Sequence, residues 1–308
     1  MKLVYLGSPE AAVAPLRSLV AAGHDVVLVV TRADKKRGRG GALLPSPVKA
    51  AATELGLTVT DRLTDVFDAV TAGAELGVVV AYGRLIKPDL LAELDFVNLH
   101  FSLLPRWRGA APVERAILAG DRETGVCLMA LEAGLDTGGV YRQLTTGIDP
   151  DESADSLRAR LVSLGTAMLV DALADGLGQP VPQHGEPTYA AKLDPAEFAL
   201  AWDRPAVELH RLVRLGLAYT TFRGKRIKVL RSRVATAAET GPAETGPVDG
   251  GPVDAGSIGA GAGRGVLVGT GDGVLELLRV QPEGKAPMDA SAWRNGAQPI
   301  AGERLGAP

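Results

Sequence analysis

The chain has 308 residues, 46% of them hydrophobic, and its 33 Lys and Arg against 36 Asp and Glu give a formal net charge of −3. This composition excludes a wholly disordered chain and favours two domains, and the single Cys127 excludes a disulfide framework and a multi-cysteine zinc site. No apolar run approaches the ~20 residues that span a bilayer, so a cytoplasmic chain without a membrane partner is expected, and the acidic balance argues at first against nucleic acid.

Strand and helix signals alternate over the first half of the chain. Strands are predicted at 2–7, 25–31, 77–82, 96–100 and 125–131, and helices from Ser8-Pro9 to Gly23, from Ser46-Pro47 to Gly56 and over 152–175. In both Ser-Pro pairs the serine suits a helix N-cap and the proline the first turn. Strands separated by helices predict an α/β domain with a Rossmann-like, doubly wound parallel sheet over residues 1–187.

The pattern changes after about residue 180. Residues 188–203 are predicted to be a linker, and 204–308 a smaller, C-terminal β-barrel domain of OB-like type. Its predicted elements are a helix at 205–217 and strands at 221–234, 265–270 and 273–281. The stretch 235–263 repeats Gly, Pro, Ala and acidic residues that cannot pack a core, which predicts a mobile surface loop.

The first strand–helix turn argues against a dinucleotide cofactor. A Rossmann site needs Gly-x-Gly-x-x-Gly there, whereas this chain has Gly7-Ser8-Pro9-Glu10. The chain has no P-loop or His-Glu-x-x-His motif, and its four histidines are scattered along the sequence. No metal site is therefore expected.

Asn98 and His100 are the first candidate catalytic residues. They lie two apart on a predicted strand, so both side chains leave the same face, near the end where open α/β sheets bind ligands. An amide donor beside an imidazole suits stabilisation of an oxyanion while a proton moves. The alternative is a hydrogen-bonded core histidine.

A carboxylate is the expected partner of His100. Asp136 lies in Gly134-Leu135-Asp136-Thr137-Gly138, where the glycines permit a tight turn between two strands. Next to His100 it would hold the imidazole in one tautomer. Without such a neighbour it would be an ordinary turn residue.

Several motifs in order resemble the 10-formyltetrahydrofolate-dependent formyltransferases, most closely those acting on methionyl-tRNA. The resemblance runs almost end to end and is carried by Gly7–Glu10, Gly38-Arg39-Gly40, Pro45–Lys49, Val79–Gly83, Asn98-x-His100, Ser102-Leu103-Leu104-Pro105-Arg106-Trp107-Arg108-Gly109-Ala110-Ala111-Pro112, Gly134–Gly138, Thr270–Gly273 and Gln281–Lys285. Agreement of many motifs in order is far more specific than one short motif. It implies the formyltransferase fold for the first domain.

The resemblance implies transfer of the formyl group of 10-formyltetrahydrofolate to the α-amine of methionyl-initiator tRNA, in translation initiation. Asn98, His100 and Asp136 match the family's catalytic trio, and no metal is required. Asn98 and His100 would stabilise the oxyanion while Asp136 orients His100. The folate donor would bind the loop Ser102, Leu103, Leu104 and Pro105, with Tyr82 and Gly83 lining the same cleft. A monomer is expected.

One position departs from many family members, which carry a small residue between the histidine and the serine. This chain has Phe101 there. Successive side chains on a strand point to opposite faces, so Phe101 is expected to point away from His100 and to pack.

The charge is unevenly distributed. Residues 204–308 carry 14 Lys and Arg against 10 Asp and Glu, a net charge of +4, while 1–203 carry 19 against 26, a net charge of −7. Six basic residues with no acid among them lie within 223–233: Arg223, Lys225, Arg226, Lys228, Arg231 and Arg233. Arg223, Lys225, Arg226 and Lys228 are predicted to bind tRNA phosphates, the alternative being a solvated edge strand guarded by cations.

A second basic segment is the loop with Arg32, Lys35, Lys36, Arg37 and Arg39. The resemblance assigns this loop to the acceptor stem of the tRNA. The alternative is an unstructured surface loop.

Two other functions remain open at this point. One is a formyltransferase acting on a nucleotide-linked amino sugar or a purine precursor, whose relatives share Asn-x-His and Asp but not the whole Arg106–Pro112 stretch together with a basic β-domain. The other is a tRNA- or folate-binding module without turnover, against which the intact trio argues.

Overall fold

The computed structural model describes residues 1–37, 42–236, 254–260 and 265–306. The chain divides into two compact units, of 1–115, 122–148 and 156–192, and of 116–121, 149–155 and 193–308. The main division, after Lys192, lies within the predicted linker 188–203. Of the helices described, none is long and apolar enough to cross a membrane.

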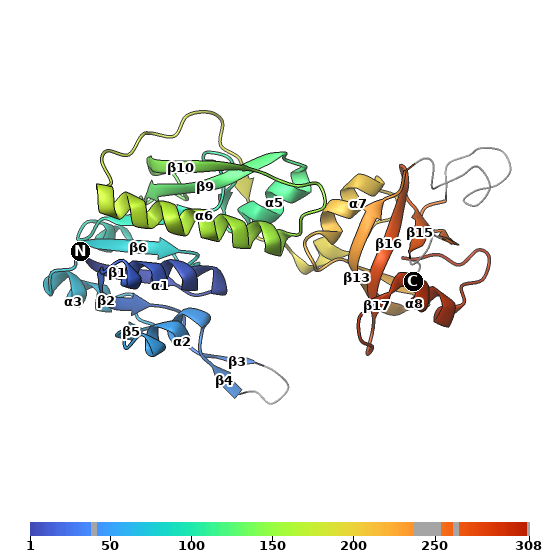
Figure 1. The fold of residues 1–308 in the computed structure, drawn as a ribbon, viewed down its shortest axis with the longest axis horizontal. Coiled ribbons are helices and arrows are strands. Elements are labelled where there is room, and N and C mark those ends of the chain that lie inside the picture. Colours follow the sequence, from blue (N-terminus) through green and yellow to red (C-terminus); the bar gives the residue numbers. More distant parts are fainter. Residues whose placement is uncertain (38–41, 237–253, 261–264, 307–308) are drawn as a thin grey trace. The chain divides into compact units, whose positions relative to one another are not determined.

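A seven-stranded sheet forms the first unit (Figure 1). In spatial order its strands are β10 (Val140–Gly147), β9 (Glu123–Ala130), β7 (Phe96–His100), β6 (Leu76–Val80), β1 (Lys2–Gly7), β2 (Asp25–Val30) and β5 (Val59–Thr60). The five from β7 to β5 are parallel, which confirms the α/β fold class. β9 and β10 extend one edge antiparallel. A run of apolar residues carries no information on strand direction. The sequence therefore predicts the strand at β9 but not that it runs antiparallel to β7.

The order of the strands marks a binding edge. β2 lies on one side of β1 and β6 on the other, so the strand order reverses beside β1. β1, β6 and β7 are buried along almost their whole length. In such sheets ligands bind outside the carboxyl ends of the strands at this reversal. His100, the last residue of β7, lies at the carboxyl end of the strand next to β6.

Helices connect the strands: α1 (Val13–Ala21), α2 (Pro47–Glu54), α3 (Asp65–Thr71), α4 (Pro88–Leu91), α5 (Pro112–Ala119) and α6 (Ala154–Asp175), with a 3-10 helix at Glu10–Ala12. Ser46 caps α2 as predicted, since its hydroxyl accepts from the Lys49 amide at 3.0 Å. The cap predicted at Ser8 is wrong. The Ser8 hydroxyl accepts instead from the Arg32 amide at 3.2 Å, and the chain enters α1 through the 3-10 turn.

Two short pairings complete the first unit. β3 (Lys35–Arg37) and β4 (Ala42–Leu44) form a hairpin, and β8 (Arg108–Gly109) pairs in parallel with β11 (Tyr189–Ala190). The second pairing brings the segment after residue 187 against the segment that follows β7.

The second unit is an antiparallel sheet that fits the predicted OB-like domain. Its strands are β12 (Tyr219–Phe222), β13 (Lys225–Val234), β16 (Val274–Pro282), β15 (Val266–Gly269) and β14 (Ile258–Ala260), with β17 (Met288–Asp289) against β16. The other elements are α7 (Ala206–Val213), α8 (Ala290–Ala297) and a 3-10 helix at Pro195–Phe198. Phe222 meets Trp293 edge to face, with ring centroids 5.4 Å apart.

The single strand predicted at 221–234 is a hairpin in the structure. Arg223 and Gly224 have φ values of 49° and 70°, as both residues of a tight type I′ turn require. An arginine at the first position hides this turn, because Asn, Asp or Gly usually marks it. Of the stretch 235–263, residues 237–253 and 261–263 lie outside the described part, and β14 lies in the remainder.

The packing of α6 on β9 generates a stability prediction. A Cβ at Gly165 of α6 would lie 2.9 Å from Val126 Cγ2 in β9, closer than side-chain atoms pack. We expect Gly165→Leu to lower the free energy of unfolding by about 2 kcal/mol, because overpacking outweighs the gain in helix propensity. Gly296→Leu is the control, since a Cβ at Gly296 of α8 meets no atom within 4 Å. Urea unfolding measures both, and equal midpoints would contradict the expectation.

Candidate active site

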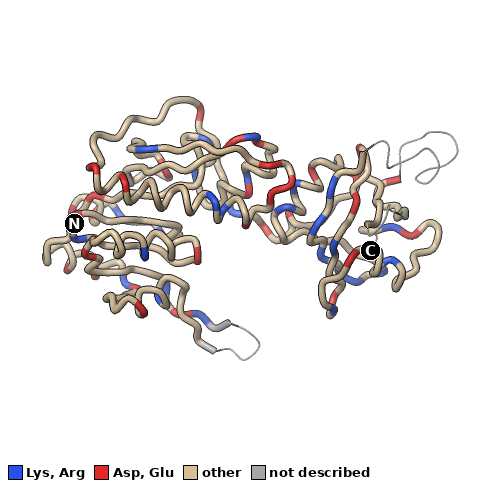
Figure 2. Tube along the Cα trace, viewed as in Figure 1, with Lys and Arg blue, Asp and Glu red and all other residues tan. Residues whose placement is uncertain are grey.

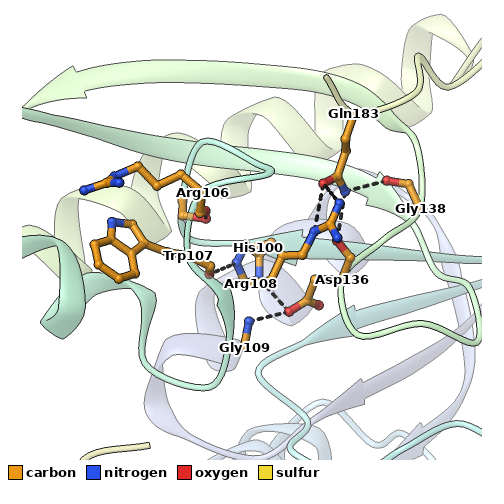
Figure 3. Close-up of polar contacts among 9 residues, drawn as sticks. His100, Arg106, Trp107, Arg108, Gly109, Asp136, Gly138 and Gln183 are labelled. Carbon is orange, nitrogen blue, oxygen red and sulfur yellow. Dashed lines mark hydrogen bonds and ion pairs between the residues drawn. The ribbon is translucent and has the colours of Figure 1, made fainter. Parts of the chain in front are cut away.

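His100 is buried, 5% exposed, and has a polar neighbour at each ring nitrogen (Figure 3). Its Nε2 lies 2.9 Å from the Trp107 carbonyl oxygen, and its Nδ1 lies 3.6 Å from Asp136 Oδ2. A carbonyl oxygen only accepts hydrogen bonds, so Nε2 carries a hydrogen. In the neutral ring Nδ1 then holds the lone pair. A proton that reaches Nδ1 lies next to a carboxylate.

Both partners of His100 come from residues in the left-handed region. Trp107 has a φ of 62° and Asp136 a φ of 50°. Such a conformation in a residue other than glycine costs about 1–3 kcal/mol and persists only where surrounding contacts enforce it. At Trp107 the backbone N–H donates to Thr188 Oγ1 at 2.9 Å. The chain therefore accepts local strain in order to hold both groups at the imidazole.

Asp136 is fixed by a hydrogen-bond network at its turn. Its Oδ2 accepts from the Gly109 amide at 2.8 Å. Gln183 Nε2 donates to the carbonyl oxygens of Asp136 and Gly138, both at 2.8 Å, and Gln183 Oε1 accepts from Arg108 Nε and Nη2 at 3.1 and 2.6 Å (Figure 3). Gln183 has no sequence signal as a site residue, because no short motif connects positions 47 residues apart.

Asn98 lies on the same face of β7 as His100. In the register with β9, Asn98 stands opposite Met129 and His100 opposite Cys127. Asn98 is 9% exposed, and its side chain has no hydrogen-bond partner among the described residues. A buried amide of this kind is available to a ligand oxygen. The structure therefore places the three predicted catalytic residues at the end of β7 and in the loop that contacts it.

The predicted folate loop is a closed turn. The hydroxyl of Ser102, which is fully buried, donates to the Arg106 carbonyl oxygen at 2.6 Å, and the Arg106 amide donates to the Leu103 carbonyl oxygen at 3.0 Å. Leu104 packs with Cys127 and Met129 of β9, and its peptide bond to Pro105 is cis. Because the Leu104 side chain is buried in this cluster, the turn offers a ligand its backbone N–H and C=O groups. Phe101, before this turn, is buried as predicted.

Tyr82 and Gly83 follow β6. The Tyr82 ring is buried in the core cluster that includes Leu6 and Leu90, and the Arg84 guanidinium lies 5.9 Å from its centroid. Gly83 has a φ of 74°. Tyr82 therefore stabilises the end of β6 by packing. Gly83 forms a turn whose positive φ favours glycine.

The basic loop of the first unit is a hairpin. Lys35, Lys36 and Arg37 form β3, and Arg39 lies outside the described residues. Arg32 lines a cleft of about 310 Å³ at the carboxyl ends of β2 and β5, together with Lys49, whose ammonium pairs with Asp34 at 2.9 Å. The Arg32 guanidinium has no described partner. It is thus available to an anion.

Several cations of the second unit lie along β13 (Figure 2). Lys225, Arg226 and Lys228 are exposed, while Ile227, before Lys228, and Val229, after it, are buried. The Arg226 guanidinium lies over the Tyr219 ring, 3.6 Å from its centroid. Stacking of this kind orients the cation without neutralising it.

Arg223 differs from the other predicted contacts on this strand pair. Its guanidinium donates to both carboxylate oxygens of Glu303, at 2.6 and 2.7 Å. The Arg223 guanidinium lowers the pKa of the Glu303 carboxyl to about 2, with a smaller contribution from the Ile300 amide. Since its charge is already matched within the unit, Arg223 offers a phosphate less than Lys225 or Lys228 does.

In the described part of the chain, no group of three or more His, Cys, Asp and Glu side chains could hold a metal ion. Cys127 is buried opposite His100, and burial raises the pKa of its thiol to about 11. The Cys127 side chain packs with Leu104 and Met129.

The raised pKa of Cys127 predicts its reactivity. At pH 8 only about one thiol in a thousand would be ionised, and the thiolate is the reactive form. We expect a chromogenic disulfide reagent to label the native protein far more slowly than the urea-unfolded protein, in which the pKa returns to its ordinary value. Equal labelling rates in the two states would contradict the burial.

Comparisons with known proteins extend these observations. Residues 1–173 match the formyl transferase family model, and 192–298 match the model of the formyl transferase C-terminal domain. The chain is 42% identical over 314 residues to a methionyl-tRNA formyltransferase of Jannaschia sp., covering 97% of each chain. It is 41% identical over 324 residues to the methionyl-tRNA formyltransferase of Symbiobacterium thermophilum, covering 100% of this chain and 96% of the relative.

Solved structures resemble the fold at lower identity. An N-formyltransferase from Helicobacter canadensis, solved with folinic acid and dTDP-3-aminofucose, has a TM-score of 0.65 at 17% identity, covering 92% of this chain and 99% of its own. HypX from Aquifex aeolicus in complex with tetrahydrofolic acid has a TM-score of 0.60 at 15% identity, covering 96% of this chain and 47% of its own. At these identities the likeness shows the fold alone.

Proposed function

The chain belongs to the formyl transferase family, and from that premise we propose that it transfers the formyl group of 10-formyltetrahydrofolate to the α-amine of methionyl-initiator tRNA. The observation that carries the proposal is the likeness to methionyl-tRNA formyltransferases across both units, at 42% identity over 97% of the chain. The predicted trio, Asn98 and His100 on β7 and Asp136 in the turn between β9 and β10, supplies the chemistry. This role in translation initiation places the chain in the cytoplasm.

The residues present fit a formyl donor. Asn98 contributes a buried amide without a described partner, and the turn 102–105 contributes backbone groups above a cluster of apolar side chains. An apolar site with a few placed polar groups is typical of sites for flat heterocycles.

We propose the following steps for the transfer, with the roles of the residues taken from their contacts. The methionyl nitrogen attacks the formyl carbon, and the Asn98 amide donates to the formyl oxygen as negative charge develops there. His100 Nδ1 takes up the proton that the amine loses, with the Asp136 carboxylate 3.6 Å away to stabilise it. A new C–N bond forms, the bond to N10 of the folate breaks, and the proton passes to N10. Donors placed in this way contribute about 2–4 kcal/mol each.

A formyltransferase acting on a nucleotide-linked amino sugar is the alternative. The Helicobacter canadensis enzyme, solved with dTDP-3-aminofucose, shares its fold with this chain at 17% identity, which does not indicate the substrate. Exposed cations along β13 have no evident use for a small nucleotide-linked substrate, whereas they suit a polyanion. The tRNA substrate is therefore favoured.

The activity test uses charged initiator tRNA, an amino-sugar nucleotide and a purine precursor as competing acceptors with the same formyl donor. We expect formylation of the tRNA alone, and kcat reduced about 10²–10³-fold in His100→Ala, Asn98→Ala and Asp136→Asn because each removes a group that acts in the transition state. His24→Ala, outside the site, is the control. Formylation of a small amine without formylation of tRNA would refute the proposal, and full activity of His100→Ala would refute the site.

Salt dependence tests the second unit as a phosphate-binding surface. We expect Lys225→Ala and Lys228→Ala to weaken tRNA binding. Each variant should also reduce the slope of log affinity against log salt by about 0.7–0.9, because its binding neutralises one phosphate fewer and so releases fewer counterions. Arg223→Ala is the matched comparison and should change the slope less, because Glu303 already pairs with that guanidinium. Unchanged slopes in both lysine variants would mean that β13 is only a solvated strand.

A further inference from the structure

We propose that Gln183 is a positioning residue for the transfer: its side-chain amide holds the Asp136 turn against the Arg108–Gly109 segment and thereby places the Asp136 carboxylate at His100. The expected effect on formylation rests on the proposed function. The positioning of Asp136 rests on the contacts within this chain alone.

The two ends of the Gln183 amide have different tasks. The nitrogen donates to two carbonyl oxygens on either side of Thr137, those of Asp136 and Gly138, both at 2.8 Å. The oxygen accepts two hydrogen bonds from the Arg108 guanidinium. The amide nitrogen donates twice and the amide oxygen accepts twice, so hydrogen bonding as well as packing fixes the orientation of the amide.

The contacts of Gln183 join the two segments that meet at His100. Arg108 follows Trp107, whose carbonyl oxygen holds Nε2, and Gly109 donates to Asp136 Oδ2 at 2.8 Å. Gln183 bridges from Arg108 back to the main chain of Asp136 (Figure 3). Removing the bridge loosens the Asp136 turn and the Arg108 side chain without changing the Trp107 carbonyl or the Asp136 carboxylate, the two groups beside the imidazole.

Asp136 has particular need of such a bridge. Its φ of 50° is a conformation that a non-glycine residue leaves unless external contacts hold it. The Gln183 nitrogen binds the carbonyl oxygen of that same residue. A displacement of about 1 Å at a reacting group can cost 10²-fold in rate, so a small relaxation of this turn matters.

The polarity of the amide suggests a discriminating substitution. Gln183→Glu has nearly the same shape and keeps an oxygen toward the Arg108 guanidinium. It replaces the donating nitrogen with an oxygen that faces two carbonyl oxygens. Side-chain volume is thus conserved while the contacts to the Asp136 turn are lost.

We expect Gln183→Glu to lower kcat for formylation about 10–100-fold, with the KM values for tRNA and for the folate donor changed less than about twofold. Gln179→Glu is the matched control, because it makes the same charge change at an exposed position four residues earlier in the chain. In an Asp136→Asn background, Gln183→Glu should cost little more, since residues that act through one another are not additive. A kcat equal to that of Gln179→Glu, or full additivity with Asp136→Asn, would overturn the proposal.

A readout without turnover separates this inference from the proposed function. Hydrogen exchange at the Gly109 amide should be faster in Gln183→Glu than in the wild type, because its acceptor on Asp136 is no longer held, and unchanged in Gln179→Glu. Unchanged exchange in Gln183→Glu would overturn the positioning role whatever the enzyme formylates. Faster exchange in a protein that formylates no tRNA would support the positioning role while the proposed function fails.

Discussion

The site depends on one buried imidazole that is hydrogen-bonded at Nε2 and faces a carboxylate at Nδ1. A carbonyl oxygen at 2.9 Å fixes the hydrogen on Nε2 of His100, and a carboxylate at 3.6 Å faces Nδ1. Both come from residues with a positive φ, Trp107 and Asp136. The strain at these two residues would relax if the segments were free. Much of the surrounding loop structure is thus needed to keep two unfavourable conformations in place.

This constraint explains features of the first unit that otherwise look incidental. The two-residue strand β11 pairs with β8 directly beside Trp107, and Thr188, the residue before β11, accepts from the Trp107 amide. The chain after residue 176 therefore returns across the segment that follows β7 before it continues into the second unit. Five residues earlier the same returning segment carries Gln183. A stretch that reads as a Gly- and Pro-rich connection contributes supporting contacts to the site.

Local patterns explain how far the sequence could predict this structure. Continuous apolar runs gave the strands, and Asn98 and His100 could be paired because side chains two apart on a strand share a face. Contacts between distant segments leave no such pattern. Gln183 has no motif, and Arg223 conceals a two-residue turn at a position where glycine or asparagine is usual. Ser8 failed as a cap because the Arg32 amide competes for its hydroxyl.

The turn at Arg223 also determines what the basic strand can do. Because β12 and β13 are joined by two residues, the register is fixed and Lys228 stands opposite Tyr219. A shift of one residue would turn Ile227 and Val229 to solvent and bury lysines, at a large desolvation cost. The alternation of buried aliphatic and exposed cationic residues therefore locks the charge outward. The net charge of −3 averages over this arrangement, so the sign that a polyanion meets is set by hairpin register rather than by composition.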